Sequence, residues 1–372
     1  MKVVITGGLG FIGQSLAKHL LPLGHDVLLI DSLNAQIHGE VPAPSVPPGA
    51  SVVRLDVRDL AERAELFEGC DAVVHLAAET GTAQSMYRIG HYVDVNERGT
   101  AALLEAIGKC TRRPKHVVLA SSRSVYGEGA YVRPRDPAQI IQPPPRSRES
   151  LAAAAWEPLD AAGNSLQAAP TPESLAFAPG SIYAATKASQ ELLINAAASA
   201  LGFRSTVFRF QNVYGEGQSL QNPYTGIISI FFNRARQGLD IPIFEDGIES
   251  RDFIHISDIV SALTTSLEAN LASGVVMNLG SGAPTSVFTL ARSLLLASGF
   301  KVPIRITGQY RVGDIRHCYA DLTRARKWLG FEPQVPLDEG LKRFCAWAVH
   351  EPVYEDRSSI AAAELRAKGL AS

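Results

Sequence analysis

A glycine-rich turn that directly follows a short apolar run near the N-terminus constrains this chain more than any other feature. Residues 3–5 are apolar, and residues 6–13 contain four glycines. The apolar residues that follow recur at helical spacing, so we expect a strand, a tight turn and a helix. Unpaired N–H groups and the helix dipole favour an anion such as a pyrophosphate at such a helix start. Because an ordinary strand-to-helix turn would read the same way, the rest of the sequence is needed to distinguish the two.

Glycine permits the tight turn, the close approach of a phosphate and the close packing of helix on strand. The residues of this segment predicted to bind a cofactor are Gly7, Gly10, Phe11, Ile12 and Gly13.

Length and composition indicate a globular protein. The 372 residues suggest about two domains, and 46% hydrophobic against 19% charged content argues against global disorder. The net charge of −2 indicates no basic surface for nucleic acid, and no apolar stretch approaches the ~20 residues that span a membrane. The four cysteines are scattered, which fits reduced thiols better than disulfides or zinc. We therefore expect a cytoplasmic protein with no cleavable signal, membrane segment, nucleic-acid partner or metal.

A second apolar run ends in Asp31, 18 residues after Gly13. This spacing is close to that of the carboxylate that binds an adenosine ribose diol. An acid here would repel a 2′-phosphate, which favours NAD over NADP. A strand-end aspartate that caps the next turn is the less favoured interpretation.

Further apolar runs at 52–57, 72–78 and 116–122 alternate with helical patterns at 59–67 and 92–109. This rhythm predicts an α/β fold with a Rossmann-type, doubly wound parallel sheet. Ligands of such sheets bind at the carboxyl ends of the strands. The residues expected to line that crevice, besides those named above, are Asp56, Ala77, Ala78 and Ser122. His75 fits a structural role better than a catalytic one.

Residues 128–180 interrupt this rhythm with prolines and small residues. They are long for a connection inside a compact domain. We interpret them either as an insertion over the crevice mouth, with Trp156 and Pro158 packed on the body, or as a mobile surface excursion.

Tyr183 and Lys187 lie four residues apart in an expected helix, so they share one face. An ammonium beside a phenol favours the phenolate and lowers its pKa from about 10. The pair therefore predicts a general base. Such a pair is common on helix surfaces. The functional interpretation is stronger here because the same chain also contains the glycine turn and Ser122.

Together these motifs resemble the extended short-chain dehydrogenase/reductase superfamily, in particular its NAD-dependent nucleotide-sugar epimerases and dehydratases. The resemblance covers about residues 1–350. The matching segments are 6–13, Asp31, 56–57, 75–78, Asn96, 121–127, 183–187, 209–215, 251–255 and 311–314.

The resemblance implies a role for each matched position. Tyr183 would be the base that removes a sugar hydroxyl proton, Ser122 would share that hydrogen bond, and Lys187 would also hold the nicotinamide ribose. It adds Val57 and Asn96 to the expected NAD contacts. The expected substrate contacts are Ser85, Ser122, Ser124, Asn212, Asn222, Arg251, Arg311 and Asp314. Arginine suits the phosphates because it binds oxyanions in bidentate fashion, although a surface salt bridge would use the same residue type.

The chain departs from the 4,6-dehydratases, which carry an Asp-Glu pair directly after the hydroxyl residue. Arg123 and Ser124 stand there instead, and neither can perform that carboxylate chemistry. The motifs at 84–86, 121–131, 218–226 and 310–318 resemble the group of dTDP-L-rhamnose 4-epimerases, which make dTDP-6-deoxy-L-talose. The resemblance also places Cys318 where related epimerases limit the sugar pocket, although a buried apolar thiol is an equally good interpretation.

Several alternatives remain open at this point. They are a 4-epimerase for UDP-hexose or UDP-N-acetylhexosamine, a sugar-nucleotide keto-reductase, and an NAD-binding regulatory protein without catalysis. We expect an NAD-binding domain over 1–210, an interleaved α+β substrate lobe over 211–350 and a tail over 351–372. Within the lobe, helical patterns lie at 213–240, 258–270 and 286–299, and a strand-like run lies at 275–279. The resemblance also implies a homodimer through the helices at 92–109 and 181–201.

Overall fold

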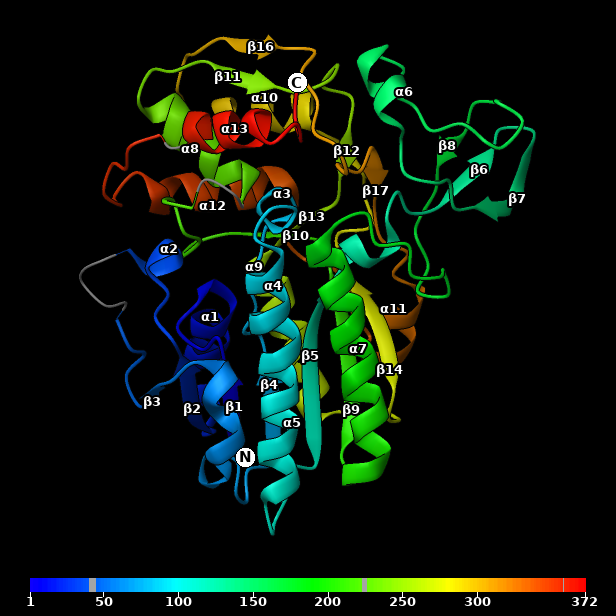
Figure 1. The fold of residues 1–372 in the computed structure, drawn as a ribbon. Helices are drawn as coiled ribbons and strands as arrows, with labels where there is room; N and C mark the ends of the chain where they lie inside the picture. The colour runs from blue at the N-terminus through cyan, green and yellow to red at the C-terminus, as the bar shows by residue number, and fades with distance from the viewer. Residues whose placement is uncertain (40–44, 223–225, 357) are drawn as a thin grey trace.

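The fold is built on a seven-stranded, wholly parallel sheet (Figure 1). The computed structural model describes residues 1–39, 45–222, 226–356 and 358–372. Residues 223–225, part of one motif used above, and residue 357, part of the expected tail, lie outside the described residues. In spatial order the strands are β3 (Ser51–Arg54), β2 (Asp26–Asp31), β1 (Lys2–Thr6), β4 (Ala72–His75), β5 (His116–Ser122), β9 (Arg204–Phe210) and β14 (Val275–Leu279).

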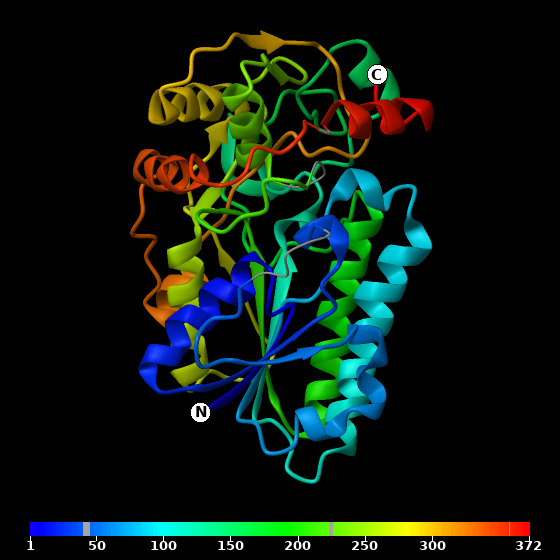
Figure 2. The same cartoon turned by 90° about the vertical axis from the view of Figure 1, so that its left-hand side faces the viewer.

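Helices cover both faces of this sheet, as the edge-on view in Figure 2 shows. On one face lie α1 (Phe11–Leu20), α9 (Ile256–Glu268) and α11 (Thr323–Leu329). On the other lie α4 (Ile89–Val93), a π-helical turn (Asp94–Arg98), α5 (Gly99–Lys109) and α7 (Ile182–Leu201). Because both faces are covered, the strands are apolar almost throughout. The expected Rossmann-type fold is confirmed.

The local sequence explains why α7 begins and ends where it does. The Ser181 hydroxyl accepts a hydrogen bond from Ala184 N, which caps the first turn. Gly202 ends the helix with φ +77°, a left-handed conformation that glycine adopts without strain. The cap fixes the helix start, and with it Tyr183, beside the carboxyl end of β5.

The insertion at 128–180 has secondary structure of its own and lies beside the lobe (Figure 1). Its three-stranded antiparallel sheet joins β7 (Asp136–Ile141), β6 (Tyr131–Arg133) and β8 (Gln167–Ala168), next to helix α6 (Arg148–Ala152). The ring of Trp156 lies 6.4 Å from that of Tyr310. The insertion therefore packs against the body of the protein.

The lobe sits above the carboxyl edge of the sheet around its own apolar core. Its helices are α8 (Ile227–Arg236), α10 (Val287–Ser298) and α12 (Leu337–Ala348). Its strands pair as β10 (Asn212–Tyr214) with β13 (Phe253–His255), β11 (Ile241–Ile243) with β16 (Ile304–Ile306), and β12 (Ser250–Arg251) with both β15 (Thr285–Ser286) and β17 (His317–Cys318).

Several elements differ from the expectation. The run at 275–279, grouped with the lobe, is the edge strand β14 of the main sheet. The helical pattern at 213–240 yields only the short α8. Instead of one helix at 59–67, two 3₁₀ segments occur, Val57–Glu62 and Ala64–Leu66. The tail forms helix α13 (Ser358–Ala367), and its last residues pair with the segment at 310–312. These outcomes depend on long-range packing, which overrides local pattern.

Candidate active site

The glycine turn forms a cradle with no room for side chains. Gly7 has φ +66°, and a Cβ there would lie 2.8 Å from Ala77 N. A Cβ on Gly13 would lie 2.5 Å from Gly7 O. Helix α1 begins at Phe11, and no side chain caps its N-terminus. The first N–H groups of the helix therefore face the turn without a side-chain acceptor. This cradle fits a dinucleotide phosphate, and it brings together the predicted Gly7, Gly10, Phe11, Gly13 and Ala77.

Asp31 lies at the end of β2 beside this turn and is nearly buried. Its carboxylate accepts hydrogen bonds from Leu9 N at 3.0 Å and Leu33 N at 2.8 Å. Burial raises its pKa, but the interaction with His38 and the two backbone donors outweighs burial and lowers the pKa below its usual value. Oδ1 contacts both Leu33 N and His38, whereas Oδ2 accepts only from Leu9 N among the described residues and keeps a lone pair for a ribose hydroxyl. No pattern in the sequence indicated His38, whose Nε2 lies 3.4 Å from Asp31.

Asp56 has local partners at the start of the first 3₁₀ segment. Its carboxylate accepts from Arg58 N at 3.0 Å and forms an ion pair with the Arg58 guanidinium at 2.8 Å. Val57 is buried, and its side chain packs against Gly99. The NAD contacts predicted for Asp56 and Val57 stay predictions.

Asn96 is completely buried. Its Oδ1 accepts from Glu79 N at 2.8 Å, while Nδ2 donates to Glu79 O at 3.1 Å and to Thr186 Oγ1 at 2.9 Å. Because both amide protons are used, Asn96 holds the loop after β4 against helix α7. Its predicted NAD contact stays a prediction.

His75 is buried between two hydroxyls, 2.7 Å from Thr6 Oγ1 and 3.0 Å from Thr100 Oγ1. Burial lowers its pKa to about 3, so the ring is neutral. This agrees with the structural role expected for it.

Ser85 is also fully buried and connects two parts of the site. Its hydroxyl donates to Thr82 O at 2.6 Å and accepts from Tyr183 N at 3.0 Å. The hydroxyl proton is used, so Ser85 holds the start of α7 in place. Its predicted substrate contact stays a prediction.

The three predicted catalytic residues meet at the carboxyl end of β5. Ser122 Oγ accepts two hydrogen bonds from Ser124, at 3.2 Å from its N and 3.0 Å from its Oγ. Because Ser122 Oγ acts only as an acceptor in these two hydrogen bonds, its own hydroxyl proton is free to be donated. It is directed to Tyr183, where this hydrogen bond lowers the phenol pKa. Lys187 is buried and donates to Ala120 O at 2.8 Å.

The predicted electrostatics of the Tyr–Lys pair is wrong for this structure. Burial raises the pKa of Tyr183 above its usual value, against the opposing effects of Ser122 and Arg123. Burial likewise lowers the pKa of Lys187 to about 7, against the effect of Glu191. The lysine points to a backbone carbonyl, and the cation that lowers the phenol pKa is Arg123.

The predicted substrate residues from the second half of the chain lie in the lobe, with Asn212 in β10 and Arg251 in β12. Asn212 Nδ2 donates to Asp252 O at 2.9 Å, and Arg251 Nη1 donates to Ser250 O at 2.9 Å. The Arg311 guanidinium lies 4.4 Å from the centre of the Phe244 ring. Arg251 pairs in register with Cys318, which is buried. Asp314 lies three residues after Arg311 in the same loop. Asn222 is buried and directly precedes residues 223–225, which the structure does not describe.

Comparison with known proteins agrees with this geometry. A family model described as "NAD dependent epimerase/dehydratase family" matches residues 3–154 and 161–280. The chain belongs to this family.

Individual relatives cover nearly the whole chain. A dTDP-L-rhamnose 4-epimerase of Burkholderia thailandensis is 35% identical, over 94% of this chain and 95% of its own length. The crystal structure of a Thermotoga maritima UDP-glucose 4-epimerase with UDP-glucose matches with a TM-score of 0.77 at 28% identity, over 94% of this chain and 99% of that one. A structure of MoeE5 with UDP-glucuronic acid and NAD matches with a TM-score of 0.75 at 27% identity, over 94% and 99%. The expected family, the NAD cofactor and the epimerase activity are confirmed.

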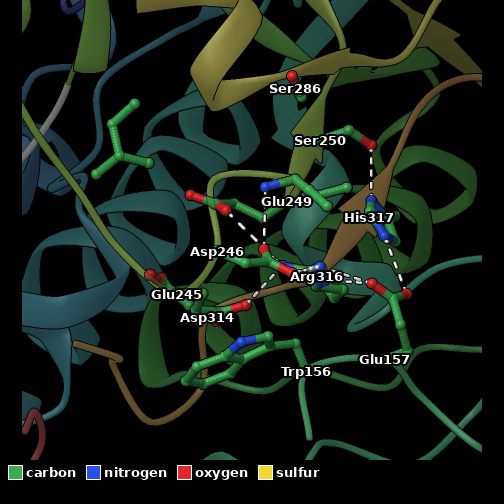
Figure 3. Close-up of polar contacts among 12 residues, drawn as sticks. Trp156, Glu157, Glu245, Asp246, Glu249, Ser250, Ser286, Asp314, Arg316 and His317 are labelled. Atoms are coloured by element: carbon green, nitrogen blue, oxygen red, sulfur yellow. Dashed lines mark hydrogen bonds and ion pairs between the residues drawn. The ribbon is translucent and has the colours of Figure 1, made fainter. Parts of the chain in front are cut away.

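Behind the substrate residues of this epimerase-family chain lies a buried ionic cluster that the sequence did not indicate (Figure 3). Arg316 is 1% exposed, and its guanidinium contacts Glu157 at 2.6 Å, Glu245 at 2.9 Å and Asp246 at 2.7 Å. Glu249 lies 3.7 Å away, and burial raises its pKa to about 7. These partners come from the insertion and from the lobe, so Arg316 joins the two.

A second buried arginine in the insertion strengthens this junction. Arg146 pairs with Glu245 at 2.9 Å and with Glu128 at 3.3 Å. Its Nη2 also donates to Asp314 O at 2.8 Å. The insertion therefore holds the loop that carries Arg311 and Asp314. Among the described residues, no helix is both long and apolar enough to span a membrane.

Proposed function

We propose that this chain catalyses the NAD-dependent 4-epimerisation of a nucleotide sugar, with dTDP-L-rhamnose converted to dTDP-6-deoxy-L-talose. The observation that carries the reaction type is the meeting of Ser122, Tyr183 and Lys187 beside the glycine cradle. The 35% identity to a dTDP-L-rhamnose 4-epimerase supports the choice of sugar. A 4-epimerase for UDP-hexoses is the second candidate, favoured by the likeness to a UDP-glucose 4-epimerase.

NAD, when bound, supplies the reversible removal and return of hydride at the sugar carbon. Its phosphates would lie at the cradle of Gly7, Gly10 and Gly13, and its ribose would contact Asp31. In its phenolate form Tyr183 takes the proton of the C4 hydroxyl and later returns it. Ser122 donates its free proton to the oxygen that carries the negative charge, whether phenolate or sugar oxygen.

The same residues disfavour the alternatives. A dehydratase needs carboxylates after the hydroxyl residue, and Arg123 and Ser124 stand there. A keto-reductase would release its cofactor in each cycle and would often use NADPH, which Asp31 disfavours. A regulator without catalysis would not need Tyr183 and Lys187 at the carboxyl end of β5.

The test is NMR analysis of dTDP-L-rhamnose after incubation with the purified protein and no added reductant. We expect an equilibrium mixture with the C4 epimer, and none with Tyr183→Phe, which should still bind NAD. An unchanged dTDP-L-rhamnose spectrum, with conversion of UDP-glucose instead, would replace the sugar assignment and keep the reaction type. Turnover by Tyr183→Phe would refute the role of the phenol.

We further propose a homodimer formed through α5 and α7. The face that carries these helices exposes apolar side chains, with Ile89 49%, Val93 38% and Leu192 60% exposed. Burying them against a second copy would remove this apolar surface from water. Sedimentation analysis of Leu192→Glu against the wild type tests this assembly, and a monomeric wild type would refute it.

A further inference from the structure

Arg123 directly follows Ser122 and opens the 3₁₀ turn Arg123–Tyr126 at the carboxyl end of β5. Its guanidinium lies beside Asn212 and Cys318 and is close enough to Tyr183 for its charge to act on the phenol. Its Nη1 is enclosed and has no hydrogen-bond partner among the described residues. A guanidinium has five N–H donors, and a buried donor without an acceptor is costly. Such a group is satisfied when a ligand supplies the acceptor.

The surroundings of Arg123 orient the guanidinium without neutralising it. Nη2 lies 3.5 Å from Asn212 Oδ1, at the long limit of a hydrogen bond. The Cys318 thiol also contacts the guanidinium, and a thiol is a weak acceptor. No carboxylate among the described residues forms an ion pair with Arg123, in contrast to Arg146 and Arg316. Arg251 and Asp314 act on the guanidinium through their charges alone, in opposite directions, so the positive charge remains available to a ligand.

We propose that Arg123 is a substrate-binding residue whose Nη1 donates a hydrogen bond to an oxygen of the sugar ring beside Tyr183. This inference rests on the proposed epimerase function and names a contact that selects the sugar. The reacting hydroxyl must lie next to Tyr183 and Ser122, so an acceptor that reaches Nη1 belongs to the sugar rather than to the diphosphate. The effect of Arg123 on the phenol pKa independently places its charge at the reacting end.

The diphosphate has two other candidate partners, Arg311 and Arg251, and the charge of Arg251 also acts on Arg123. Arg311 lies over the Phe244 ring, and its Nε is enclosed without a partner among the described residues. Arg251 is anchored to the carbonyls of Ser250 and Arg316. We therefore propose that Arg123 contacts the sugar and that Arg251 and Arg311 contact the phosphates. The division predicts different losses of affinity for a nucleotide and for a nucleotide sugar.

The experiment compares the binding of dTDP and of dTDP-L-rhamnose by calorimetry in the NAD-loaded Tyr183→Phe protein, in which turnover is blocked. Arg123→Met in this background should weaken dTDP-L-rhamnose binding at least about tenfold, and dTDP binding less than about twofold. Arg123→Lys should fall between the two. The matched control is Arg326→Met, an exposed arginine on α11, which should change neither affinity.

Equal losses of affinity for dTDP and dTDP-L-rhamnose would indicate that Arg123 contacts the diphosphate, and would overturn the proposal. Unchanged affinities for both would make Arg123 a structural residue and also overturn it. NAD content and the melting temperature establish whether each variant is folded. If Arg123→Met is not folded, the two affinities are compared in Arg123→Lys instead. If wild-type protein fails to epimerise dTDP-L-rhamnose, the sugar assignment fails separately, and the same ratio is measured with UDP and UDP-glucose.

Discussion

Lys187 should destabilise the NAD-free protein although it belongs to the catalytic set. It is 3% exposed, and its ammonium has one neutral partner, the carbonyl of Ala120. Burial lowers its pKa from 10.5 to about 7. At a pH where Lys187 is charged in both states, this pKa change lowers the free energy of unfolding by roughly 5 kcal/mol. A neutral side chain of similar length, as in Lys187→Met, would remove this penalty.

The sign of the pH dependence follows from proton counting. Between pH 7 and 10.5 the unfolded chain keeps a proton on Lys187 that the folded chain has released, so wild-type stability rises with pH in this window. Below pH 7 the penalty is complete. Lys187→Met leaves the Ala120 carbonyl unpaired, which costs about 1–3 kcal/mol. At pH 6 the variant should therefore be more stable than the wild type by about 2–4 kcal/mol.

Urea unfolding of both proteins without NAD, at pH 6 and at pH 10, measures this difference. We expect the advantage of Lys187→Met to disappear at pH 10, and its turnover to be lost at every pH. Lys327→Met, which changes an exposed lysine on α11, is the control and should alter neither stability nor its pH dependence. A variant that is less stable than the wild type at pH 6, or a pH-independent difference, would refute the reasoning.

Three further changes test other parts of the site. Gly13→Ala places a Cβ 2.5 Å from Gly7 O, so NAD content after purification should fall at least about tenfold; normal NAD content would argue against the cradle. Arg316→Met removes the buried cation that pairs with Glu245 and Asp246 and lies near the buried Glu249, and it should cost about 3–5 kcal/mol in urea unfolding. Deleting residues 370–372 removes the backbone pairing of the 310–312 segment. Because Arg311 lies there, steady-state kinetics should show KM raised about three- to tenfold with kcat little changed.

The sequence predicted the parts of the fold that follow from local pattern. The buried strand ending in Ser122 and the helix that begins after Ser181 are recognisable because periodicity and capping lie within a few residues. The sheet position of 275–279 was missed, because pairing with β9 is a long-range choice among several apolar runs. The antiparallel sheet of the insertion was missed for a related reason, since its strands are short and join residues as distant as 131 and 168.

The candidate site shows the same division. Residue types and spacings were sufficient to propose Asp31, Tyr183 and Lys187 as candidates, because they match the family motif. They were not sufficient to show which way the lysine points, and its predicted effect on the phenol was therefore wrong. The cluster around Arg316 joins residues as far apart as 157 and 316, and no local pattern indicates such a contact.

The insertion is joined to the lobe by buried ion pairs, which fits an insertion packed on the body better than a mobile surface excursion. Arg146 and Arg316 tie it to the lobe through buried carboxylates, and a buried ion pair is costly to break. The same cluster reaches the substrate side, because Arg251 Nη1 donates to the Arg316 carbonyl at 3.0 Å and Arg146 donates to the Asp314 carbonyl. A movement of the insertion would therefore displace both segments that carry the predicted phosphate-binding arginines, strand β12 and the loop with Arg311. An anion bound between these two segments would, in turn, strengthen the attachment of the insertion to the lobe.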